Sequence, residues 1–115
     1  MREEAIRFAT KLLDKTKDGK LPWEATYDSN SFICVLDGDL SFTIMKGERE
    51  LYALEMKDNA ESVVFREAMR APDSNTTSAY DRDYEILAEL HERARRAALQ
   101  IDKKIAKAEQ FLDNL

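Results

Sequence analysis

The chain of 115 residues contains few of the residues that interrupt or cross-link a fold: three glycines, two prolines, one cysteine and one histidine. The single cysteine, Cys34, excludes an intrachain disulfide framework and favours a reducing compartment. No run approaches the roughly 20 apolar residues of a membrane helix. Acidic residues within positions 1–15 leave no uninterrupted apolar core of a signal peptide. We therefore expect a cytoplasmic protein without membrane attachment.

The sequence also lacks the motifs that most often mark catalytic or nucleotide-binding sites. It contains no glycine-rich phosphate loop, no dinucleotide-binding fingerprint and no HExxH, CxxC or GxSxG pattern. Cys34 lies in an apolar run with no base nearby, which is typical of a buried core cysteine. His91 has Leu87 and Ala88 at the spacings where a helical metal ligand would stand, so we interpret it as structural. We predict no catalytic residue, no cofactor and no metal site.

The net charge and the distribution of basic residues indicate which kinds of partner the chain can bind. The net charge is −5, which disfavours nonspecific binding to nucleic acid or to an anionic membrane. Four basic residues nevertheless recur on one helical stripe and form a candidate surface for an anionic partner: Arg93, Arg96, Lys103 and Lys107. The alternative is a solvated helix face, because Glu89–Arg93 and Glu92–Arg96 are ordinary pairs at a spacing of four.

The first two-thirds of the chain change from helical to strand periodicity. Apolar residues at spacings of three and four predict a helix over residues 2–18, with Gly19 as its cap and Pro22 preventing its continuation. Alternating residues over 23–66 predict an antiparallel β-meander of four to five strands. A three-residue turn at 37–39 pairs Leu36 with Leu40 and puts one apolar set on a shared face: Phe32, Cys34, Leu36, Leu40, Phe42 and Ile44.

The second face of the strand at residues 31–36 is also apolar, since it carries Ile33 and Val35. A strand that is apolar on both faces is typical of a sheet covered on both sides. We therefore expect either two helices, one for each face, or one helix and a partner subunit.

After a loop over 70–78, apolar residues spaced by four and three predict one long helix over 79–114, with Ser78 and Asp81 as a capping box. From Tyr80 to Leu115 such a helix would be about 54 Å long, whereas a compact domain of this size is about 35 Å across. The helix must break, or its overhang must pack on another chain. If the overhang packs on another chain, the sequence predicts a homodimer through small and branched residues on the apolar row of this helix, which we call the seam. These residues are Ala94, Ala98, Ile101, Ile105, Ala108 and Leu112.

Two segments together resemble a group of small uncharacterised bacterial proteins. Residues 13–26 give the pattern K-T-x-x-G-x-L-x-W-x-x-T after a first helix, and residues 90–99 give L-x-x-x-A-R-R-x-A-L within a later helix. The resemblance covers nearly the whole chain. It implies a bacterial or phage source and supplies no activity and no catalytic residues.

We thus expect one α+β domain over residues 1–115: an N-terminal helix, an antiparallel meander and a long C-terminal helix. The expected function is that of a noncatalytic protein–protein interaction protein, acting as a homodimer and binding a further protein, with nucleic acid disfavoured. Two alternatives remain open. One is a small-molecule or nucleotide-binding module, and the other is an inhibitor from a phage or mobile element that binds a larger enzyme.

Overall fold

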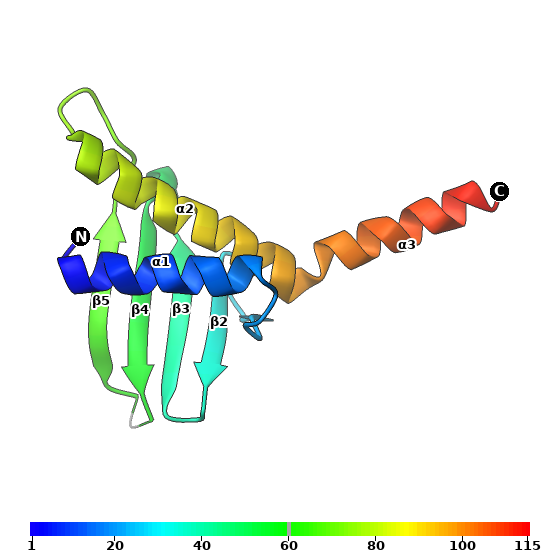
Figure 1. Ribbon diagram of the computed structural model, residues 1–115, viewed down its shortest axis with the longest axis horizontal. Helices are drawn as coiled ribbons and strands as arrows, with labels where there is room; N and C mark the ends of the chain where they lie inside the picture. The colour runs from blue at the N-terminus through cyan, green and yellow to red at the C-terminus, as the bar shows by residue number, and fades with distance from the viewer. Residues whose placement is uncertain (60) are drawn as a thin grey trace.

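The computed structural model describes residues 1–59 and 61–115. An N-terminal helix precedes a five-stranded antiparallel sheet, and two further helices follow it (Figure 1). This arrangement confirms the predicted α+β class. The elements are α1 (Glu3–Lys17), β1 (Glu24–Ala25), β2 (Ser31–Leu36), β3 (Leu40–Lys46), a short 3-10 turn (Glu48–Glu50), β4 (Tyr52–Asp58), β5 (Val63–Met69), α2 (Ser78–Leu99) and α3 (Ile101–Asp113).

The strands follow one another in spatial order, each antiparallel to the next. Leu36 lies opposite Leu40, and Phe42 lies opposite Cys34, so the predicted register of the first hairpin is confirmed. Burial on this face is uneven along the strands. Ile44 is fully buried, whereas Leu36 is half-buried and Leu40 is 37% exposed near the hairpin turn. The helices therefore cover one end of the face and leave the hairpin end open.

Both α1 and α2 lie on the same face of the sheet (Figure 1). The ring of Phe8 in α1 packs in a tilted arrangement against that of Phe42 in β3, with the ring centroids 4.8 Å apart, and α2 packs beside α1. On the opposite face Val35 is 50% exposed. The expectation of one helix for each face is therefore wrong. Because the two helices also pack against each other, they build a single core on one side of the sheet.

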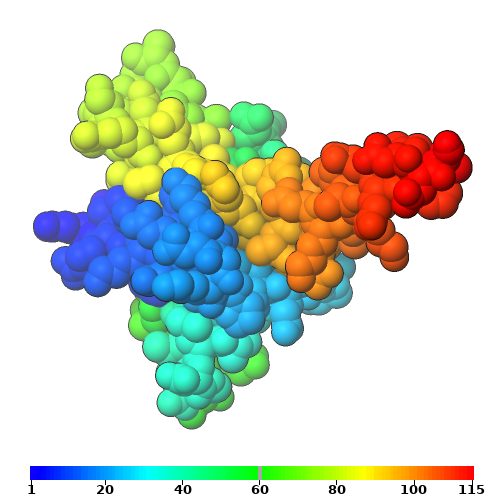
Figure 2. Space-filling model, turned by 45° about the vertical axis from the view of Figure 1, so that its right-hand side comes forward, coloured from blue at the N-terminus to red at the C-terminus, as the bar shows by residue number. Residues whose placement is uncertain are grey.

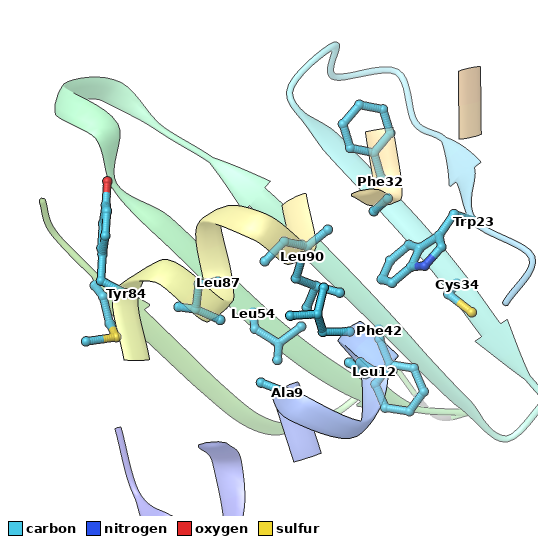
Figure 3. Close-up of a cluster of buried hydrophobic side chains, with 14 residues drawn as sticks. Ala9, Leu12, Trp23, Phe32, Cys34, Phe42, Leu54, Tyr84, Leu87 and Leu90 are labelled. Atoms are coloured by element: carbon cyan, nitrogen blue, oxygen red, sulfur yellow. The ribbon is translucent and has the colours of Figure 1, made fainter. Parts of the chain in front are cut away.

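The core lies between the sheet and these two helices. Figure 3 shows side chains from α1, α2 and the sheet pointing into one cluster, which includes Ala9, Leu12, Phe42, Leu54, Leu87 and Leu90. Trp23 closes the end of this cluster and is buried with its indole N–H donating to Thr16 Oγ1 at 2.9 Å. The indole nitrogen thus keeps a hydrogen-bond partner while its ring fills the core.

The start of α2 differs from the predicted capping box by one residue. Thr77, not Ser78, is the N-cap, and its hydroxyl oxygen accepts a hydrogen bond from the Tyr80 backbone N–H at 3.1 Å. The carboxylate of Asp81 instead accepts from the Thr76 hydroxyl at 2.6 Å. Both Thr and Ser are good N-caps, so the sequence alone does not separate them.

The predicted continuous helix over 79–114 is two helices. Gln100 adopts a left-handed conformation, with φ 53° and ψ 41°, between α2 and α3. This conformation costs about 1–2 kcal/mol for a residue with a side chain. Arg96 and Asp102 bridge the break through an ion pair of 2.9 Å. The last buried side chain of α2 is Ala94, and Ala98 and Leu99, just before the break, are partly buried against the core.

Candidate protein-binding surface

Helix α3 projects away from the rest of the molecule (Figures 1 and 2). None of its residues is buried. The Cα radius of gyration is 15.8 Å, compared with about 13 Å for a compact chain of this length. The larger value agrees with a helix that extends beyond the body.

Helix α3 nevertheless carries a face of large apolar side chains. The exposed fraction is 48% for Ile105, 67% for Phe111 and 63% for Leu112, and it reaches 88% for Leu115 just after the helix. At 100° per residue Ile105, Phe111 and Leu112 fall within one third of the helix circumference. We call them, with Ile101, Ala108 and Leu115, the α3 apolar face. A helix with such a face ordinarily packs it against another element.

Charged residues flank this face on both sides. Lys104 and Lys107 border a shallow depression of about 460 Å³ formed with Ala108, Phe111 and Leu112. By the same helical geometry, Glu109 and Asp113 lie along the other flank. Beyond Asp102, the basic residues come first along the helix and the acidic residues follow. The surface therefore combines an apolar centre with a charge order that a partner can recognise.

The structure places the predicted interface residues in two groups. Ala94 is fully buried in the core of its own chain, so assigning it to an intermolecular interface is wrong. Ala98 is half-buried and packs against the same core, because α2 still follows the body at this point. Ile105, Ala108 and Leu112 are exposed on α3, and Ile101 is half-buried at the break. The available part of the predicted seam is thus the part beyond Gln100.

The predicted interface residues do not include Phe111, an exposed residue of α3. It directly precedes Leu112, which belongs to the row of residues spaced by four and three. Its large aromatic ring beside Leu112 was the signal for it in the sequence. Leu115 belongs to the row but follows the last helical residue.

The predicted basic stripe is divided by the same break. Arg93 and Arg96 lie on α2, whereas Lys103 and Lys107 lie on α3. Arg96 forms ion pairs with Glu92 at 3.2 Å and with Asp102 at 2.9 Å, and Arg93 lies 3.8 Å from Glu89. The arginines therefore have carboxylates of their own chain as partners. The structure does not bring the four cations onto one straight surface.

The histidine and the cysteine both lie in the core. His91 Nε2 is 2.9 Å from the carbonyl oxygen of Asn30, and the imidazole packs 5.4 Å from the ring of Phe32 and 5.5 Å from that of Tyr52. Burial lowers the pKa of His91. Burial also raises the pKa of the Cys34 thiol, which makes it a poor nucleophile. Within residues 1–59 and 61–115, no cluster of three or more His, Cys, Asp or Glu side chains could hold a metal ion.

A second apolar surface runs beside α1 over the open end of the sheet. One depression of about 390 Å³ has Phe8, Leu12, Leu21 and Leu36 in its lining, together with Glu4, Arg7, Lys11 and Lys15. A second depression of about 310 Å³ shares Glu4 and Phe8 with the first and continues to Met56, Val64 and Phe65. We call the two together the α1 trough.

Among the described residues, no helix combines the length and the apolar character needed to cross a membrane. Comparisons with protein-family models, with curated proteins and with solved structures gave no match.

Proposed function

We propose that this chain is a noncatalytic protein-binding module that forms a homodimer through α3. The observation that carries the proposal is the exposure of the α3 apolar face, in which Phe111, Leu112 and Leu115 are each more than half exposed. A large apolar side chain gains about 1.5–3 kcal/mol when it leaves water. Several such residues on one projecting helix thus provide a strong reason for association.

A second copy of the chain is the partner that we favour. Closed two-fold pairs are the commonest assemblies of identical soluble chains, because each copy covers the exposed patch of the other. A helix of 13 residues is also marginally stable in water without packing contacts. Association would therefore support α3 itself as well as bury its apolar face.

The proposal is tested by placing a carboxylate on each side of α3. Ile105→Asp puts a charge into the apolar face, whereas Gln110→Asp puts the same charge on the opposite side of the helix. Sedimentation velocity at tens of micromolar should show a dimer for the unmodified chain and for Gln110→Asp. It should show a monomer for Ile105→Asp, because an unpaired carboxylate in an apolar interface is strongly unfavourable. A dimer that tolerates Ile105→Asp as well as Gln110→Asp would exclude α3 as the interface.

Ile105 is a better position for this test than Ile101. Ile101 is half-buried beside the break at Gln100, whereas Ile105 is exposed and has no buried neighbour on its helix. Loss of the dimer in Ile105→Asp would therefore report on association and not on the core.

A further inference from the structure

We infer that α3 of one chain docks into the α1 trough of a second chain, so that the dimer forms by reciprocal exchange of C-terminal helices. The inference rests on the proposed self-association and identifies the surface that receives α3. Four features support it: the open end of the sheet, the lengths of the two surfaces, their apolar content and their charge order.

The trough lies where the sheet lacks a covering helix. Helices α1 and α2 cover one end of the sheet face, and the strands continue past α1 toward the β2–β3 hairpin (Figure 1). Leu36 and Phe65 belong to this face of the sheet, and Phe65 lies opposite Met56 in the register of β4 and β5. Both side chains are only half-buried. A further helix laid alongside α1 would complete the helical layer over the sheet.

The lengths of the two surfaces match. The trough follows α1 from Arg2 to Lys15, which corresponds to about 20 Å of helix. Helix α3 has 13 residues and is also about 20 Å long. One α3 can therefore fill the trough from end to end.

The chemical character of the two surfaces is also complementary. The trough floor consists of large apolar side chains, among them Phe8, Leu36 and Phe65. The α3 apolar face offers Ile105, Phe111 and Leu112 at the spacing by which a helix docks into a groove. Docking removes both apolar surfaces from water, and in a reciprocal dimer it does so twice.

The charge order of the two helices gives the direction. Helix α1 is acidic in its first turn and basic later, with Glu3 and Glu4 followed by Arg7, Lys11 and Lys15. Beyond Asp102, helix α3 has the reverse order, with Lys103, Lys104 and Lys107 followed by Glu109 and Asp113. If α3 runs parallel to α1 with its apolar face on the sheet, its acidic flank, with Glu109 and Asp113, lies beside the basic residues of α1, while Lys104 and Lys107 lie on the flank away from α1.

The charge order of α3 is unfavourable for an isolated helix. Acidic side chains are stabilising near a helix N-terminus and basic ones near its C-terminus. Beyond Asp102, α3 has the opposite arrangement, and its last turn contains no basic residue. A basic partner surface beside Glu109 and Asp113 would offset this cost.

The competing arrangement is direct pairing of α3 with α3 as a parallel coiled coil. It would place Lys104 of one helix beside Glu109 of the other, the usual spacing of interhelical pairs. However, α3 contains only about two heptads, and coiled coils are ordinarily sustained over at least three to four. It would also leave the trough uncovered. We therefore favour the trough as the receiving surface.

The test uses charge reversal on each surface separately and then on both. The trough variant is Arg7→Glu with Lys11→Glu, and the α3 variant is Glu109→Lys with Asp113→Lys. All four positions are exposed, so the core is untouched. The α3 variant also improves the charge order of that helix, so melting of α3 would not explain a lost dimer. Arg49→Glu with Arg82→Glu is the matched control, because it reverses two exposed cations outside the trough.

Dimer dissociation constants are measured by sedimentation equilibrium on each chain. We expect the trough variant and the α3 variant each to weaken the dimer by at least about tenfold, because both docking contacts lose their opposite charges. The chain carrying all four reversals should recover most of the affinity, and the control should match the unmodified chain. An unchanged dimer in the trough variant, together with a monomer for Ile105→Asp, would overturn trough docking while leaving self-association through α3 intact. A monomeric unmodified chain would overturn both.

Discussion

One uninterrupted pattern of residues spaced by four and three runs through α2 and α3. Most of its residues in α2 are buried, whereas most of those in α3 are exposed. In α2 the seam residues Leu87 and Ala94 are fully buried and His91 is 5% exposed. In α3 the same row continues through Ile105 and Leu112, which are 48% and 63% exposed. Periodicity thus identifies the apolar face of a helix but not the surface that covers it.

The difference has a structural origin. Helix α2 lies across the sheet beside α1, so the row up to Ala94 meets the core of its own chain. The left-handed residue Gln100 then directs α3 away from that core. The first half of the row serves folding, and we propose that the second half serves association.

The largest contrast is expected from truncating one leucine in each helix. Leu90→Ala should lower the free energy of unfolding by about 2–5 kcal/mol, because Leu90 is fully buried in the core. Leu112→Ala should change it by less than about 0.5 kcal/mol at concentrations where the chain is monomeric. Urea unfolding followed by the fluorescence of Trp23 measures both. Equal losses from the two substitutions would mean that α3 packs on the body of its own chain.

A smaller effect is expected from the histidine in the buried half of the row. Burial lowers the pKa of His91, Lys46 and Arg95 act in the same direction, and the Asn30 carbonyl and Glu92 oppose the shift. The unfolded chain therefore binds a proton at His91 at a higher pH than the folded chain does. The contribution of neutral His91 to stability is complete above about pH 6.5 and is lost as the pH falls through its folded pKa.

His91→Gln provides the comparison for this prediction, because its side-chain amide can still donate a hydrogen bond to the Asn30 carbonyl oxygen. Stability measured between pH 7.5 and about pH 5 should fall less in His91→Gln than in the unmodified chain. Parallel pH profiles for the two chains would show that burial of the imidazole has no energetic consequence.

The smallest change in stability is expected at Gln100, between α2 and α3. Its sign distinguishes a break from a continuous helix. Gln100→Gly should raise stability by up to about 1 kcal/mol, because glycine adopts a left-handed conformation without steric cost. In a continuous helix the same substitution would instead lower stability by about 0.5–1 kcal/mol. Urea unfolding together with far-ultraviolet circular dichroism gives the sign. A destabilised Gln100→Gly chain would contradict the break between α2 and α3.

Patterns that depend on near neighbours were predictable. The register of the first hairpin followed from the pairing of Leu36 with Leu40 across a short turn. The burial of Cys34 followed from its apolar strand. Local rules were sufficient in both cases, because turn length and alternation determine which side chains share a face.

Features that depend on tertiary packing were not predictable in the same way. Neither glycine nor proline marks the break at Gln100, so local preferences favoured a continuous helix. The apolar second face of β2, with Ile33 and Val35, indicated cover on both sides of the sheet. The packing of α1 against α2 places both helices on one side instead. The α1 trough arises from that placement and has no motif of its own.

The most direct test of α3 as a self-association surface is the mass of the unmodified chain in solution. Multi-angle light scattering over a range from one to a hundred micromolar should approach twice the 13.3 kDa of a single chain as concentration rises. Ile105→Asp should remain at the mass of one chain over the same range. A constant monomer mass for the unmodified chain at the highest concentration would contradict the account.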